Sequence, residues 1–170
     1  MDPISHLIEH FQMEPLPGEG GFFVRTYISE ETLPASVLPA RYGEDKSFRS
    51  MILYLITGHP QGFSALHTLL TDEILHFYLG DPLETLLLYP DGSSCRVVLG
   101  QEIFAGQHIQ LVVPRGVWQG THLLPGGRYA LIGAGMAPAY TDRDFTLGKR
   151  AELAARYPAE ADLIHRLTRE

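Results

Sequence analysis

The sequence predicts an all-β fold, a double-stranded β-helix or jelly-roll barrel with a short N-terminal helix and C-terminal helices. From residue 49 onward, short apolar runs recur about every 8–12 positions and are separated by turn residues, as in a barrel or sandwich. Gly and Pro, 17 and 12 of the 170 residues, supply turns along the whole chain. This length suits one domain, so we predict a single domain over residues 1–170.

Each element follows from its local pattern. Residues 3–11 place their apolar side chains at helical spacing and predict a helix. The glycine-rich segment 18–21 breaks the chain before a first strand at 22–28, and the polar segment 30–48 predicts a loop over the barrel. Further strands are predicted at 50–57, 63–70, 73–79, 84–89, 94–99, 109–113, 117–123 and 128–135.

Composition changes after Pro138, where the apolar runs regain helical spacing. We predict helices over 147–157 and 158–167, and Pro158 suits the first position of the second one. The barrel core is thus predicted at about 20–138, followed by a helical extension over 146–168.

Composition also limits the partners and the compartment. The net charge is −7, and the 13 Lys and Arg residues form no basic stripe, so nucleic acid is not an expected partner. No apolar run reaches the roughly 20 residues of a membrane span, and the N-terminus has no secretory pattern. Cys95 is the only cysteine, which excludes an internal disulfide. We expect a soluble, cytoplasmic protein without a membrane partner.

The segment from Gly62 to Gly80 carries the most chemical information. Side chains alternate faces along a strand, so His67 shares a face with the apolar positions of its strand, and Glu73 does the same on the next strand. A tight turn between the two strands brings both side chains toward one apolar interior. Burying a His and a carboxylate there is costly unless they pair or serve a function.

The spacing of these residues follows two motifs. The first runs His, any residue, His, three or four residues, Glu, six residues, Gly; this chain has His67, Leu69, Glu73 and Gly80. The second contains Pro, any residue, Gly, two residues, His; this chain has Pro114, Gly116 and Gln119. The sequence thereby resembles the cupin superfamily, whose fold is the RmlC-like jelly roll.

Further short sequence motifs narrow the resemblance to one less-characterised cupin family, and this resemblance covers roughly residues 5–167. These short motifs are Glu19-Gly20-Gly21, Ser64 to His67, Asp72-Glu73 with Gly80, Val113 to Gln119, and Ala137-Pro138 before Asp142 to Phe145. Each short motif is weak by itself, and their common order and spacing carry the resemblance.

The departures from the motifs bear on metal binding. Metal-dependent cupins use three His and one Glu, whereas Leu69 and Gln119 replace two of these His residues here. A catalytic zinc or iron centre needs three protein ligands in most cases. We therefore expect no cofactor, and a metal-dependent cupin enzyme with a reduced ligand set stays as an alternative.

We predict His67 and Glu73 as catalytic residues, since the resemblance implies that RmlC-like epimerases use a His at the position of His67 as base. The alternative is a paired polar plug that fixes strand register. His76 and His122 point to the opposite faces of their strands by alternation. Polar or aromatic side chains near the two motifs are the candidate ligand contacts, each with core packing or surface exposure as the alternative: Gln110, Gln119, Trp118, Tyr129, Arg49 and Ser64.

Three functions remain open. The first is a metal-independent epimerase or isomerase, or a related lyase, that acts on a small polar, sugar-like molecule. The second is the metal-dependent enzyme, and the third is a non-catalytic protein that binds a small ligand. A homodimer is expected, because the apolar runs 52–55 and 86–89 predict strands buried on both faces.

Overall fold

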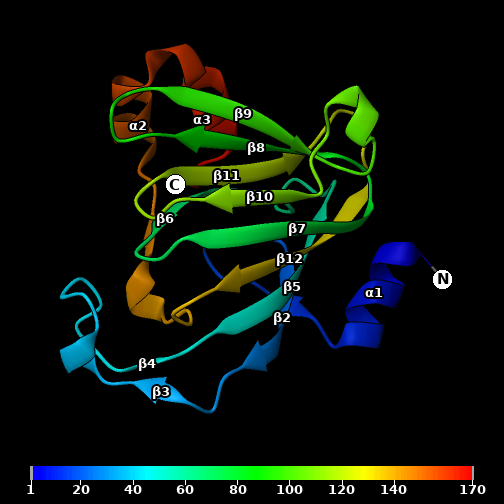
Figure 1. The fold of residues 1–170 in the computed structure, drawn as a ribbon. Helices are drawn as coiled ribbons and strands as arrows, with labels where there is room; N and C mark the ends of the chain where they lie inside the picture. Colours follow the sequence, from blue (N-terminus) through cyan, green and yellow to red (C-terminus); the bar gives the residue numbers. More distant parts are fainter. Residues whose placement is uncertain (1, 170) are drawn as a thin grey trace.

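The protein, as a computed structural model that describes residues 2–169, is built around two large antiparallel sheets that face each other (Figure 1). Within these residues a six-stranded sheet has the order β1 (Glu14–Pro15), β2 (Phe22–Ile28), β5 (Ser50–Thr57), β12 (Tyr129–Met136), β7 (Glu73–Gly80) and β10 (Gln110–Val113). A five-stranded sheet has the order β13 (Phe145–Leu147), β6 (Ser64–Leu69), β11 (Trp118–Leu123), β8 (Leu83–Leu88) and β9 (Ser94–Leu99). The predicted all-β jelly roll is confirmed.

The helices lie on the outside of the two sheets (Figure 1). They are α1 (Pro3–Phe11), α2 (Arg150–Arg156) and α3 (Ala161–Arg166), with short 3-10 turns η1 (Ala35–Val37), η2 (Ile103–Ala105), η3 (Asp142–Asp144) and η4 (Pro158–Glu160). The helix predicted from residue 147 starts later, because residues 145–147 pair with β6 as strand β13. In the part of the chain that the structure describes, no helix is long and apolar enough to cross a membrane.

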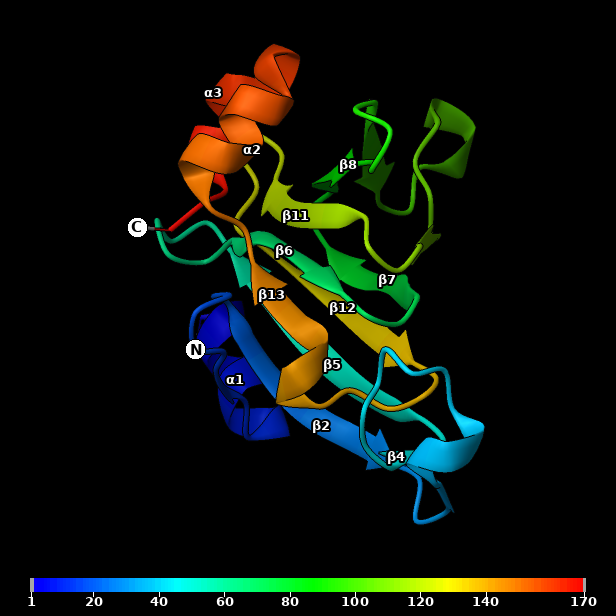
Figure 2. The same ribbon diagram turned by 90° about the vertical axis from the view of Figure 1, so that its left-hand side faces the viewer.

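Segment 30–48 is more ordered than the loop that the sequence predicts. Strand β3 (Thr32–Leu33) pairs with β4 (Lys46–Ser47), and η1 lies between them. This small sheet lies at one end of the barrel, next to the segment that leads into β13 (Figure 2).

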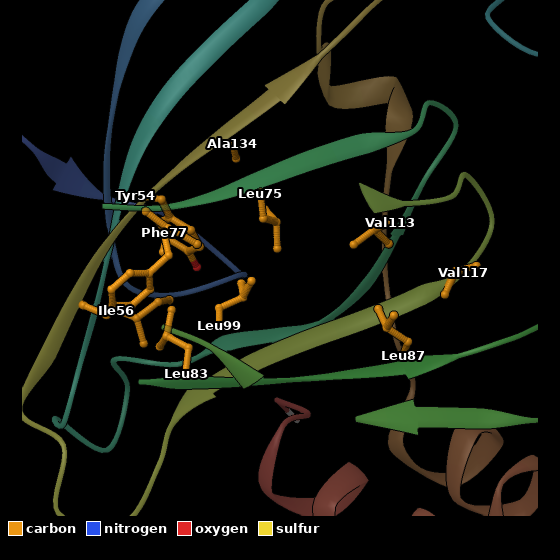
Figure 3. Close-up of a cluster of buried hydrophobic side chains, with 12 residues drawn as sticks. Tyr54, Ile56, Leu75, Phe77, Leu83, Leu87, Leu99, Val113, Val117 and Ala134 are labelled. Atoms are coloured by element: carbon orange, nitrogen blue, oxygen red, sulfur yellow. The ribbon is translucent and has the colours of Figure 1, made fainter. Parts of the chain in front are cut away.

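The core fills much of the space between the sheets, with inward side chains from both (Figure 3). Tyr54 and Ile56 of β5 point inward and are at most 4% exposed, as strand alternation requires. Leu53 and Leu55, which alternate with these two residues along the strand, point outward and pack against α1. Strand β5 is therefore buried on both faces.

Strand β8 is covered in the same way by the C-terminal helices. Leu87 faces the barrel core, while Leu86 and Leu88 pack on Leu153 of α2 and Ile164 of α3. The apolar runs that suggested a homodimer thus find their outer cover in the helices of the same chain. The homodimer stays a prediction, and these two runs no longer argue for it.

A buried ion pair fastens the β4 end of segment 30–48 to η3. Lys46 is 1% exposed, and its Nζ lies 2.6 Å from Oδ2 of Asp144, which is itself 1% exposed. The ammonium also donates to Oγ1 of Thr141 at 2.5 Å and lies 3.3 Å from Oε1 of Glu44. Removing one partner of such a pair leaves an uncompensated buried charge.

We expect Lys46→Ala to lower the free energy of unfolding by about 3–5 kcal/mol, because Asp144 then stays buried without its cation. Urea unfolding followed by circular dichroism measures the change. Lys149→Ala is the matched control, since Lys149 forms only an exposed pair with Glu152 and should unfold like the wild type. Equal stability of the two variants would contradict the assigned role of Lys46.

Candidate functional site

A cavity of ≈ 360 Å³ lies between the two sheets, next to the apolar core. About half of its lining is apolar, including Phe23, Ile52 and Phe145. Its polar lining consists of Glu19, Arg25, Ser50, Tyr54, Ser64, His67, Glu73, Gln119, Thr121, Tyr140 and Asp142. A concave, largely apolar site with a few convergent polar groups is the usual form of a small-molecule site.

A bulge in β6 turns two polar residues toward the cavity. His67 pairs with Gln119 of β11 and Ser64 pairs with Thr121, so three steps along β6 match two along β11. Strict alternation would have placed Ser64 and His67 on opposite faces, but the extra residue lets both face inward. Both are buried, at 3% and 4% exposed.

The contacts of His67 fix the role of each ring nitrogen. Nδ1 lies 2.8 Å from the carbonyl oxygen of Ala65, which can only accept, so Nδ1 carries the hydrogen and donates it. In the neutral ring, Nε2 therefore keeps its lone pair and can accept a proton. Phe145 of β13 stacks on the imidazole at a centroid distance of 5.0 Å.

Glu73 is the first residue of β7 in the six-stranded sheet. Its carboxyl contacts the five-stranded sheet through Gln119 of β11. The Gln119 amide donates from Nε2 to Oε2 of Glu73 at 2.7 Å. Burial raises the pKa of Glu73 to about 7, an effect that exceeds the lowering by His67 and by the Gln119 hydrogen bond. A carboxyl with this pKa is present in both protonation states near neutral pH.

Glu19 is a site residue that the sequence reasoning did not assign. Its Oε1 accepts a hydrogen bond from Oγ of Ser64 at 2.6 Å and lies 3.9 Å from Nδ1 of His67. The glycine-rich loop 18–21 carries it: Gly20 has φ +106°, and a Cβ there would collide with the carbonyl oxygen of Phe63. The Glu-Gly-Gly phrase of the family resemblance was the available signal for this residue.

Contacts on both sides hold this loop. On the cavity side, the hydroxyl of Tyr54 donates to the carbonyl oxygen of Gly20 at 2.8 Å. On the outer side, the guanidinium of Arg169 donates to the carbonyl oxygens of Glu19, Gln61 and Phe63. A residue distant in the sequence thereby fixes the backbone of Glu19.

Two phenols in the cavity stay protonated at neutral pH. Burial raises the pKa of Tyr54 well above its usual value, and neighbouring Glu19 adds to this effect. Burial also raises the pKa of Tyr140 to about 12, with a further contribution from Asp142. Both hydroxyls can donate hydrogen bonds, and neither is a base under these conditions.

The structure brings together four of the eight sequence-predicted site residues: His67, Glu73, Gln119 and Ser64. It places the other four outside the cavity. Gln110 is exposed on the outer face, where it contacts His76, and Arg49 is exposed beside Met51, just before β5 begins. As predicted by alternation, His76 and His122 do not line the cavity.

The two aromatic candidates serve packing instead. Trp118 packs on the cluster beneath the C-terminal helices, because its position on β11 faces away from the barrel. Tyr129 packs on the cluster beneath α1 for the same reason on β12. Placing these four residues near the cavity was wrong, because proximity to a motif in sequence does not set the face of a strand.

The donor set does not fit a three-ligand metal centre. Residues 2–169 contain no group of three or more His, Cys, Asp or Glu side chains arranged to hold a metal ion. Leu69 lines the cavity without a donor atom, and Gln119 uses its amide nitrogen on Glu73. The expectation of no cofactor rests on these residues and stays a prediction.

Comparison with known proteins gives a family and a fold. A family model described as the cupin superfamily (DUF985) matches residues 5–148. The X-ray structure of a protein from Shewanella oneidensis is similar over 99% of each chain, with 29% identity and a TM-score of 0.83. A hypothetical protein from Leishmania major matches over 98% of each chain, with 24% identity and a TM-score of 0.85.

Oxalate decarboxylase from Bacillus subtilis shares the fold alone. Its structure matches 92% of this chain and 37% of its own, with 12% identity and a TM-score of 0.51. No protein with a curated description matches this chain.

Glu73→Gln should change the pH dependence of stability. The folded-state pKa of about 7 lies above the unfolded value of 4.5, so the wild type loses stability as pH rises between these values. Gln does not ionise, so the variant should gain up to about 3 kcal/mol relative to the wild type across this window. Urea unfolding at a series of pH values measures it, with Glu102→Gln, at an exposed position, as control. A difference that does not vary with pH would rule out the raised pKa.

Arg169→Ala should loosen the Glu19 loop, because three backbone carbonyls lose a cationic donor. The amide of Ala65 donates to the Glu19 carbonyl at 2.9 Å and is the reporter in hydrogen exchange. We expect faster exchange of this amide and a loss of about 1–2 kcal/mol in the free energy of unfolding. Arg166→Ala, at an exposed position three residues earlier, should leave both unchanged. Unaltered exchange at Ala65 would show that Arg169 does not hold the loop.

Proposed function

This chain belongs to the cupin superfamily (DUF985), and on that premise we propose that it binds a small polar, sugar-like molecule in the barrel cavity and transfers a proton on it without a metal. The observation that carries the proposal is the arrangement of His67. Its Nδ1 hydrogen is donated to the Ala65 carbonyl, and its Nε2 is left as a base at the buried end of the cavity.

The size of the cavity matches this class of molecule. A volume of ≈ 360 Å³ lies at the lower end of the roughly 300–1,000 Å³ that is usual for small-molecule sites, so a molecule of the size of a single sugar fits. The apolar wall formed by Phe23, Ile52 and Phe145 suits the carbon skeleton of such a molecule. The polar side chains opposite supply hydrogen bonds that orient it.

In the proposed step, Nε2 of His67 takes a proton from a carbon next to a carbonyl group, and negative charge moves to the carbonyl oxygen. Glu73 in its protonated form donates a hydrogen bond to that oxygen, where the charge develops. When the first carbon carries a hydroxyl group, isomerisation results if that hydroxyl's proton passes to the enolate oxygen and the imidazolium returns its proton to the former carbonyl carbon. Epimerisation results if a second donor supplies a proton to the opposite face of the same carbon while His67 keeps the first proton. Glu19, near Nδ1, stabilises the imidazolium formed in between.

Two alternatives make different demands on the same residues. A non-catalytic protein would bind the molecule through the same hydrogen bonds and leave it unchanged. A metal-dependent enzyme would need His67 and Glu73 as metal ligands. It would also need a third ligand, and the residue that supplied it would have to give up the contacts that it makes in this structure.

The deciding experiment uses protein purified without chelators. Mass spectrometry identifies the small molecule that the protein releases, and that molecule is returned to fresh protein in D2O. Incorporation of deuterium at a carbon-bound position would support proton transfer. A molecule that binds and comes back unlabelled would favour binding alone.

His67→Gln should slow this deuterium incorporation by about 10²–10⁴-fold, since it removes the general base and keeps a polar side chain of similar size. NMR or mass spectrometry of the released molecule gives the rate. His76→Gln is the matched control, because His76 lies on the outer face of β7 and should leave the rate unchanged.

Metal analysis of the same preparations separates the metal-dependent alternative. Iron, nickel, manganese or zinc at one ion per chain in the wild type and in His76→Gln, and lost in His67→Gln, would overturn the metal-free proposal. A wild-type rate unaffected by dialysis against a chelator supports it.

A further inference from the structure

Arg25 faces the cavity because of the register of β2. It pairs with Ile52 of β5, and directly opposed residues in an antiparallel pair share a face, so Arg25 lies on the side where Ile52 lines the cavity. The register shifts immediately afterwards, and Tyr27, opposite Met51, is exposed on the outer face. A bulge at this point ends the inward run and leaves Arg25 as its last member.

Arg25 marks the open end of the cavity. Its side chain is exposed, whereas Ser64, His67 and Gln119 on the same cavity are at most 4% exposed. Among residues 2–169 the guanidinium of Arg25 has no partner in a hydrogen bond, ion pair or ring contact, even though Asp142 lines the same cavity. Its guanidinium is therefore available to a molecule that enters.

The buried end of the cavity offers mainly acceptors. The hydrogens of the Ser64 hydroxyl, the Tyr54 hydroxyl and Nδ1 of His67 are all donated to the protein itself. The lone pair on Nε2 of neutral His67, the carboxylate of Glu19 and the amide oxygen of Gln119 are left, and all three require donors from a ligand. Glu73 adds a donor in its protonated form, which the proposed proton transfer uses on the carbonyl oxygen. Hydroxyl groups satisfy the three acceptors, whereas an anionic group at this end would meet Glu19 with like charge.

We propose that the molecule bound here is a small hydroxylated anion whose carboxylate or phosphate group binds Arg25 and whose hydroxyl groups face His67, Glu19 and Gln119. This inference rests on the proposed function and names its substrate class. The guanidinium fork matches the oxygens of either anionic group, and this cation at the open end orients the molecule with its hydroxylated end inward.

Four probes of one carbon skeleton test the assignment. Glucuronate carries a carboxylate, glucose 6-phosphate carries a phosphate, glucose is neutral and glucosamine is cationic. Each is titrated into the full-length protein, and amide NMR shifts of the residues that line the cavity give the dissociation constant. We expect at least one of the two anions to bind about tenfold or more tightly than glucose. The ratio between the two anions tells which anionic group the site takes.

Arg25→Gln should reduce the affinity of the preferred anion to that of glucose and leave glucose binding unchanged. Arg49→Gln is the matched control, since Arg49 is an exposed arginine near the same strands but outside the cavity, and it should retain the preference. Arg25→Lys should retain part of it, because the charge stays and the fork is lost.

Several outcomes would overturn the inference. Glucose that binds as tightly as the anions, with shifts around His67, would contradict the anionic assignment and leave the polar cavity of the proposed function intact. Tighter binding of glucosamine would reverse the assigned charge. Equal loss in Arg25→Gln and Arg49→Gln would show a general effect of net charge. No cavity shifts with any probe would also overturn the anion assignment, whereas proton transfer is judged separately by deuterium incorporation.

Discussion

The hydrogen bond from Gln119 to Glu73 crosses the interior between the two sheets, and the arrangement of the site depends on it. His67 and Gln119 are paired neighbours on β6 and β11, whereas Glu73 belongs to the facing sheet. The amide holds the carboxyl near His67, and burial then sets its proton affinity. A second imidazole in place of Gln119 would suit a metal. The amide instead donates a hydrogen bond directly to the carboxyl.

The parts of the chain outside the barrel serve the same centre. Arg169 near the C-terminus fixes the loop that carries Glu19, and the Lys46–Asp144 pair fixes the turn that precedes Phe145. Helix α1 and the two C-terminal helices cover the outer faces of strands whose inner faces form the core. The barrel interior can therefore keep a polar cavity, because apolar burial is completed on the outside of the sheets.

The agreement between the sequence predictions and the structure is good for strands and poorer for the side chains that line the cavity. Strands such as 50–57 and 94–99 follow from alternation and turn residues, which act locally, and the structure has them at those bounds. Ser64 faces the cavity only because of the bulge in β6, and no local pattern marks that bulge. Arg25 reaches the same cavity through the pairing of β2 with β5, and Glu19 reaches it through a loop that Ala65 and Arg169 hold. Trp118 and Tyr129 show the reverse case, since they stand near the motif and pack on the helices.

The sequence by itself determined the all-β jelly roll, the helical ends and the inward position of His67 and Glu73, because periodicity, turn chemistry and motif spacing are properties of neighbouring residues. Only the tertiary structure decided which other side chains join that centre and which face away. Register shifts, bulges and the cover from helices are set by pairing between residues far apart in the chain. For the same reason, only the structure showed that the buried end of the cavity carries mainly acceptors while an arginine stands at its mouth.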